Sequence, residues 1–131
     1  FEAELDAGSA AYISEIAAII SIQQCPKLEG RRPKAEARRR RQLFQLPEGA
    51  SAHFTVRNRR RGDRFQPLGL PHDKKLKEFL IDRKIDAETR DAVPLLIWNG
   101  EIVWVAGVEV SEKFKVTSPA GTVYEVKLED A

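Results

Sequence analysis

The sequence predicts an α+β fold in which a β core carries one or two helices. Alternating apolar and polar residues at 54–58 and 122–128 are typical of half-buried strands, and an Asn-Gly pair at 99–100 between two apolar runs indicates a β-hairpin. Leu76, Phe79 and Leu80 have the i, i+3, i+4 spacing of one apolar helix face. A chain of 131 residues is long enough to bury such a core.

The region before residue 54 has an ambiguous pattern. The apolar positions between 12 and 20 fit a helical stripe, whereas the density of isoleucine and the Gly8-Ser9 pair favour strands, which is the interpretation we prefer. The polar stretch 26–47 contains an arginine run at 38–41, which is either a solvated loop or a disordered tail. We expect residues 1–53 to be a preceding segment of strands plus a basic loop, packed on the same domain as residues 54–131.

The middle of the chain is punctuated by turn and helix signals. Phe54 and Val56 are expected to point inward from a strand, which leads into a turn rich in Gly and Pro at 59–69. Asp73 is a candidate N-cap for the helix that contains Leu76. A second short helix is expected from Asp86 to about residue 93, where Pro94 ends it.

The Asn-Gly hairpin is predicted to be buried on both faces. A two-residue loop places Trp98 opposite Glu101 and Leu95 opposite Trp104. One face then carries Leu95, Ile97, Ile102 and Trp104, and the other carries Leu96, Trp98 and Val103. A hairpin that is apolar on both sides belongs inside a sandwich or under helices, so both tryptophans are expected in the core rather than as stacking platforms for bases. Two more strands are expected at 114–116 and 122–128, around a turn at 118–121.

Charge is segregated along the chain, although the net charge is only +2. Residues 31–84 hold 17 Lys or Arg against 6 Asp or Glu, a net of +11, and the remainder holds 5 against 14, a net of −9. A block of this size suggests a polyanion as the partner of the central region.

Several classes of function lack support in the sequence. The lone Cys25 and two distant histidines offer neither an internal disulfide nor metal-ligand spacing, and the lone thiol points to a reducing, cytoplasmic location. The apolar stretch 10–22 is too short for a membrane span. No glycine-rich phosphate loop and no nucleophile-base signature is present. We therefore predict no catalytic residue, no metal site and no membrane contact. Because the chain begins at Phe1 and contains no Met, we also expect it to be a piece of a longer protein.

An ordered series of blocks resembles a known family. These blocks are Val56 to Gly69, Lys74 to Asp82, Arg90, Val93 to Leu96, and Ile102 to Gly107. Together they are similar to the C-terminal domain of tRNA(Ile)-lysidine synthetases, and the resemblance runs from about Thr55 to Val116. Arg61 stands where the family often has Pro, and residues 70–73 replace a connection that is commonly glycine-rich.

The resemblance implies a fold, a parent activity and a partner. The fold is a small β-sandwich-like α+β module similar to one in the phenylalanyl-tRNA synthetase β subunit. The parent enzymes use ATP and Mg²⁺ to convert the wobble cytidine of isoleucine tRNA with a CAU anticodon to lysidine, in a catalytic domain that is absent here. This fragment, with its 54–131 tRNA-recognition domain, is therefore expected to bind the tRNA body or acceptor stem without cofactors and without catalysing the reaction.

The expected RNA-binding residues come from the basic turn and the helix that follows it. They are Arg57, Arg59, Arg60, Arg61, Arg64, Lys74, Lys75, Lys77 and Lys84. Four residues are expected to shape the turn: Gly62, Asp63, Pro67 and Gly69. Asp63 and Glu78 are expected to orient neighbouring cations, and Phe65 to be a packing anchor.

Two other functions remain open at this stage. One is a general RNA-binding protein of another family, which would explain the charge but not the ordered blocks. The other is a protein-interaction or oligomerisation module, such as a homodimer in which the acidic ends of one copy meet the basic middle of another.

Overall fold

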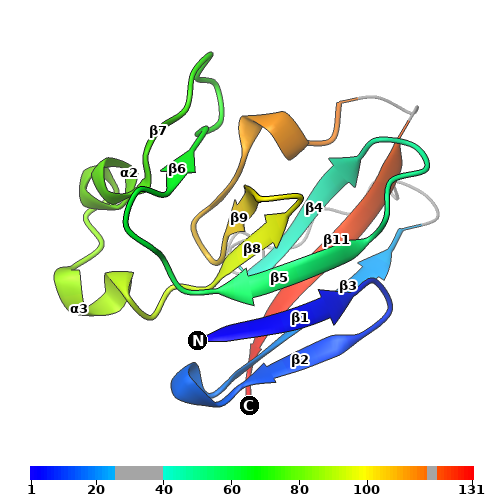
Figure 1. Cartoon of the computed structure of the whole chain (residues 1–131), viewed down its shortest axis with the longest axis horizontal. Coiled ribbons are helices and arrows are strands. Elements are labelled where there is room, and N and C mark those ends of the chain that lie inside the picture. Colours follow the sequence, from blue (N-terminus) through cyan, green and yellow to red (C-terminus); the bar gives the residue numbers. More distant parts are fainter. Residues whose placement is uncertain (26–39, 118–120) are drawn as a thin grey trace.

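The computed structural model describes residues 1–25, 40–117 and 121–131, and its strands form two facing sheets (Figure 1). A five-stranded sheet has the order β1-β5-β8-β9-β10, with strands Glu2–Asp6, His53–Arg57, Leu95–Trp98, Glu101–Val105 and Glu109–Val110. A four-stranded sheet has the order β2-β3-β11-β4, with strands Ala10–Ile13, Ala18–Gln24, Thr122–Asp130 and Arg41–Leu46. The predicted α+β, sandwich-like class is confirmed.

Smaller elements complete the fold. They are the two-stranded pair β6 and β7 (Arg64–Phe65 and Lys74–Lys75), the helices α2 (Leu76–Asp82) and α3 (Ala87–Arg90), and the 3-10 turns η1 (Ser14–Ile16) and η2 (Glu112–Phe114). Turn η1 connects β2 and β3 of the four-stranded sheet. No helix among the described residues is both long and apolar enough to span a bilayer.

The β8–β9 hairpin is buried from both sides by two separate cores. Between the two sheets, Leu96 and Trp104 pack with residues such as Phe44, Phe54 and Val126. On the opposite face the hairpin residues Leu95, Ile97, Ile102 and Val105 pack with Phe65, Leu76, Phe79 and Leu80 from β6 and α2. The hairpin therefore lies inside the sandwich and under the helix at once, which explains why neither of its faces is polar.

The predicted register of this hairpin is wrong beyond its first two pairs. Trp98 does pair with Glu101, but a β-bulge follows, so that Leu96 faces Trp104 and Leu95 faces Val105. The bulge adds one residue, Val103, to β9, and this places Trp104 on the sandwich face with Leu96 instead of on the face of Leu95. The core position predicted for Trp104 is nevertheless confirmed, whereas Trp98 is only partly buried against that core.

The amino-terminal region consists of strands, as preferred. In β3, Ala18, Ile20 and Ile22 alternate inward, and this strand pairs with β11 at the other end of the chain. Strand β1 pairs with β5 over its whole length, from Glu2 opposite Arg57 to Asp6 opposite His53. Strand β4 starts at Arg41, the end of the arginine run, while residues 38 and 39 lie outside the described residues.

Three local predictions need correction. Asp73 does not cap α2, because its carboxylate accepts from Arg64 Nε and the pairing of β7 with β6 keeps the backbone extended up to Lys75. Lys74 and Lys75 consequently lie on this strand and not on the helix.

Residues 112–114 form a 3-10 turn in place of the strand expected at 114–116, since the Ser111 hydroxyl accepts from Lys113 N–H and turns Phe114 into the core. The second helix is confirmed with Asp86 as its cap, but it ends at Arg90.

Candidate nucleic-acid interface

The arginine turn, residues 58–63 between β5 and β6, is closed by its own carboxylate. Asp63 Oδ2 accepts from the backbone N–H of Arg60 at 2.7 Å, and Asp63 N–H donates to Arg60 O at 3.1 Å. Gly62 has a φ of +89°, a conformation that residues with a Cβ rarely adopt. The turn-shaping roles predicted for Gly62 and Asp63 therefore rest on a positive φ and on a closed hydrogen-bonded turn.

Arg57, the last residue of β5, stabilises this turn through an ion pair with Asp63. Its two terminal nitrogens donate to the two Asp63 oxygens, each at 2.9 Å, and the side chains of Arg57 and Asp63 are only 11% and 14% exposed. Burial by itself would raise the pKa of the Asp63 carboxyl, but hydrogen bonds from Arg57 and from the Arg60 N–H outweigh it and hold that pKa below its usual range. Arg57 was predicted to contact RNA, but both of its terminal nitrogens are bound to Asp63 and its side chain is nearly buried.

The far end of the turn segment is anchored in the second core. Phe65 is buried with its ring centroid 4.8 Å from that of Phe79, which confirms its expected packing role. The loop from Pro67 to Gly69 is held by acidic side chains of the β10–η2 region, because Glu109 accepts from Leu68 N–H and Glu112 accepts from Gly69 N–H. Both ends of the turn are thus attached to rigid elements.

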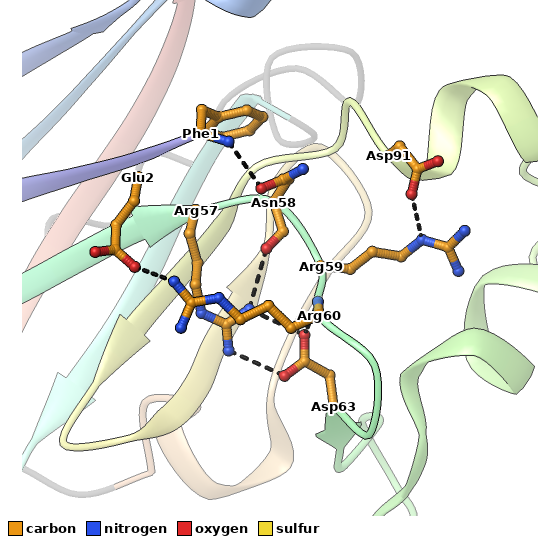
Figure 2. Close-up of polar contacts among 8 residues, drawn as sticks. All are labelled: Phe1, Glu2, Arg57, Asn58, Arg59, Arg60, Asp63 and Asp91. Atoms are coloured by element: carbon orange, nitrogen blue, oxygen red, sulfur yellow. Dashed lines mark hydrogen bonds and ion pairs between the residues drawn. The ribbon is translucent and has the colours of Figure 1, made fainter.

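Neighbouring arginines of the turn point in opposite directions. Figure 2 shows Arg60 directed toward Glu2 on β1 and Arg59 directed toward Asp91 after α3. Arg59 Nε donates to Asp91 Oδ1 at 2.8 Å, and Arg60 Nη2 donates to Glu2 Oε1. Two segments distant in sequence therefore hold adjacent side chains apart.

A groove of about 760 Å³ runs along the arginine turn and the start of α2. Its walls are formed by Arg59, Arg60, Arg61, Gly62, Asp63, Arg64, Lys75, Leu76, Lys77 and Asp91. Six of these residues are cationic and two are acidic, and Asp63 is already bound to Arg57. We name this surface the basic groove. It brings together six of the nine residues predicted to contact RNA.

The six cations of the basic groove differ in their partners. Three of them pair with a carboxylate: Arg59 with Asp91, Arg60 with Glu2 and Arg64 with Asp73. In the last pair, Arg64 Nε lies 2.7 Å from Asp73 Oδ1. Arg61, Lys75 and Lys77 form no ion pair with any residue that the structure describes. The groove thus combines oriented arginines with cations that have no counter-charge among the described residues.

The remaining predicted residues lie outside the basic groove. Lys74 pairs with Asp82 at the end of α2, and Lys84 lies beyond that helix with a positive φ of 58°. Glu78 was expected to orient a cation, but it forms no ion pair within the described part of the chain. No group of three His, Cys, Asp or Glu residues among residues 1–25, 40–117 and 121–131 could hold a metal ion.

Two carboxylates that pair with arginines of the basic groove were missed by sequence reasoning. Neither Glu2 nor Asp91 was among the residues predicted for this site. Glu2 lies 58 residues from Arg60 and Asp91 lies 32 residues from Arg59, so only the folded chain brings each pair together. The pairing of β1 with β5 carries Glu2 to the base of the turn, and this register has no signal in the sequence.

Comparison with known proteins returns one consistent family. A family model described as the TilS substrate C-terminal domain matches residues 54–126. The tRNA(Ile)-lysidine synthase of Persephonella marina is 39% identical over 97 residues, which are 74% of this chain and 22% of that protein. The enzyme of the same name from Caldanaerobacter subterraneus subsp. tengcongensis is 51% identical over 74 residues, 56% of this chain and 16% of that protein. The chain therefore spans about a fifth of the length of these relatives.

The fold has a match among solved structures. A crystal structure of the TILS C-terminal domain aligns with a TM-score of 0.76, covering 99% of this chain and 98% of that chain at 23% sequence identity. At that identity the likeness concerns the fold. It also takes in the described residues before position 54, where the family match begins.

Proposed function

The chain belongs to the TilS substrate C-terminal domain family, and on that premise we propose that it is a tRNA-binding domain of a tRNA(Ile)-lysidine synthase. The observation that carries this proposal is the basic groove, in which six cations meet two carboxylates on a surface anchored at both ends. A site on rigid elements keeps its donors in place before a ligand arrives, which lowers the entropic cost of binding.

The chemistry of the groove suits the phosphates of a folded RNA. Arginine presents a planar fork of donors that binds phosphate oxygens in a bidentate manner, and lysine adds point charges. The deep major groove of A-form RNA hides its base edges, so proteins read such helices through backbone shape and phosphate contacts. Arg59, Arg60, Arg61 and Arg64 supply forks, and Lys75 and Lys77 continue the positive charge onto α2.

The parent reaction is proposed to take place elsewhere in the full-length enzyme. We propose that the parent converts the wobble cytidine of CAU-anticodon isoleucine tRNA to lysidine, with ATP and Mg²⁺ bound by another part of the protein. What supports this division is that α2 begins directly after strand residue Lys75, without the glycine-rich loop that holds phosphates at the start of a helix. The lone Cys25 accords with a cytoplasmic enzyme.

Binding across a salt series tests the groove. Replacement of Arg61, Lys75 and Lys77 by Ala should weaken tRNA binding, because no carboxylate in the described part of the chain neutralises these cations. Each phosphate contact that is lost should reduce the slope of log K against log[salt] by roughly 0.7–0.9. Fluorescence anisotropy with a labelled CAU-anticodon isoleucine tRNA measures both quantities.

The matched control replaces Lys113, Lys115 and Lys127, which lie outside the groove and pair with Glu101, Glu112 and Glu129. The control variant should retain most of the affinity. Equal losses in both variants would mean diffuse attraction and would contradict a defined groove. Gel filtration of nuclease-treated protein separates a lost RNA contact from a change in self-association.

A second experiment tests the division of labour. We expect the purified chain to form no lysidine when it is incubated with ATP, lysine and unmodified CAU-anticodon isoleucine tRNA. Mass spectrometry of the digested tRNA detects the modified nucleoside. Its appearance would refute the proposal that catalysis resides in another part of the parent enzyme.

A further inference from the structure

We propose that Asp91 and Glu2 are positioning residues of the basic groove, which hold Arg59 and Arg60 apart so that each presents its remaining guanidinium N–H groups to a separate phosphate. This inference rests on the proposed function, since it assigns roles within the same surface. Neither carboxylate needs to touch RNA for this role, because each acts through the arginine that it binds.

The Arg59–Asp91 contact leaves the phosphate-binding fork of the arginine open. Asp91 accepts from Nε at 2.8 Å, which is the nitrogen on the inner edge of the guanidinium. No described residue bonds to the two terminal nitrogens of Arg59, and in Figure 2 they point away from Asp91. The Arg59 side chain is 24% exposed while the Asp91 side chain is 69% exposed, so the carboxylate is solvated and the arginine stem is packed. Asp91 thus restricts the arginine without occupying its fork.

The Arg60–Glu2 contact pulls the next side chain to the opposite side. Glu2 reaches the turn because β1 runs antiparallel to β5, with Glu2 directly opposite Arg57. Glu2 accepts from one terminal nitrogen of Arg60, while the rest of the guanidinium has no bond to any described residue. Figure 2 shows the two arginines diverging from adjacent positions in the chain.

Each carboxylate can affect RNA binding in two ways, by fixing the arginine side chain and by repelling RNA through its own negative charge. A free arginine side chain loses much rotamer freedom when it is fixed on a ligand, and a carboxylate that fixes it beforehand removes part of that cost. The gain is larger for a folded RNA, whose phosphates lie at set positions, than for a flexible strand that adapts to any arrangement. The negative charge of the carboxylate, in contrast, disfavours both RNAs alike. The ratio of the two affinities therefore isolates the positioning effect.

The experiment compares alanine with amide variants at both positions. Asp91→Ala and Glu2→Ala remove the charge and the hydrogen-bond acceptor, whereas Asp91→Asn and Glu2→Gln remove the charge but keep an oxygen that accepts from the arginine. Affinities for CAU-anticodon isoleucine tRNA and for single-stranded poly(U) are measured at one salt concentration. We expect each alanine variant to lower the ratio of tRNA affinity to poly(U) affinity by about two- to tenfold, the range given by ordering one long side chain. Each amide variant should restore the wild-type ratio to within about twofold, since it keeps the acceptor.

Glu129→Ala serves as the matched control, because it breaks an exposed ion pair with Lys127 on β11 and should leave the ratio unchanged. Melting temperatures of all variants check that the fold is intact. If alanine and amide variants shift both affinities equally, the carboxylates act only as charges and the inference is overturned. If the wild-type chain shows no preference for tRNA over poly(U), the proposed function fails, an outcome that is distinct from equal shifts in a selective protein.

Discussion

The β8–β9 hairpin and the arginine turn are neighbours in the fold but are stabilised by different interactions. Leu95 of the hairpin pairs with Arg57 at the base of the turn, so the two regions share one sheet. The hairpin is held by apolar burial on both faces, whereas the turn is held by one nearly buried carboxylate and its hydrogen bonds. Stability is concentrated in the first region. The second region keeps its cations near the surface, where a ligand can reach them.

The largest effect is expected in the hairpin. Trp104→Ala should lower the free energy of unfolding by about 3–5 kcal/mol, because it leaves a cavity between the two sheets. Denaturant titration monitored by circular dichroism measures the change. Tyr12→Ala is the control, since this ring is 62% exposed and its loss should stay within about 0.5 kcal/mol. Equal losses at both positions would break the distinction between core and surface aromatics.

A smaller effect is expected at the carboxylate of the turn. Asp63→Asn should cost about 1–3 kcal/mol of unfolding free energy, because it leaves the nearly buried Arg57 without its charge partner. The pKa of Asp63 is lowered in the folded state, so its contribution is present above the unfolded pKa of 3.8 and is lost as pH falls through the folded value. Thermal melts between pH 2 and 7 should therefore show a flatter acid limb in the variant. An unchanged acid limb would contradict the role of Asp63.

The groove cations should matter for binding and not for stability. Arg61→Ala combined with Lys77→Ala is expected to change the free energy of unfolding by no more than about 0.5 kcal/mol, since neither side chain has an ion-pair partner among the described residues. The same denaturant titration measures it. A clear destabilisation would show that the turn depends on these cations, and the contrast with the hairpin would then be lost.

The smallest effect concerns the edge of the five-stranded sheet. His53 on β5 contacts Asp6 and Glu4 of β1, each at 2.6 Å, and these hydrogen bonds raise its pKa above the ordinary 6.5. Its contribution is therefore complete below pH 6.5 and is lost as pH rises through the folded value. Melting temperatures from pH 5 to 9 should fall slightly over this window, and His53→Gln should remove that slope. An identical pH profile in the variant would exclude the contribution of His53.

Local sequence patterns predicted an element correctly where its conformation depends only on residues close to it in the chain. The Asn-Gly turn, the strand predicted at 54–58 and the Asp86 cap each depend on neighbours within a few residues, and each is found, the strand at His53–Arg57. The Asp73 cap failed because Arg64, on the paired strand, competes for the same carboxylate. The bulge in β9 also had no local signal, and with it the hairpin packs against a separate core on each face.

The basic groove, too, was only partly predictable from the sequence. Its cations were readable from the block of positive charge and from the resemblance to a family, both of which are properties of the linear chain. The sequence could not show that Arg57 turns inward, or that Glu2 and Asp91 hold the neighbouring arginines.

The sequence by itself determined the fold class, the family and the residues that carry positive charge. The fold class follows from periodicity, the positive residues from composition, and the family from its resemblance to the ordered blocks between Val56 and Gly107. Only the tertiary structure decided which of those cations are paired, which are free and in which direction each points. The physical reason is that electrostatic partners are chosen by distance in space, and antiparallel strand pairing brings Glu2 next to a turn that begins more than fifty residues later.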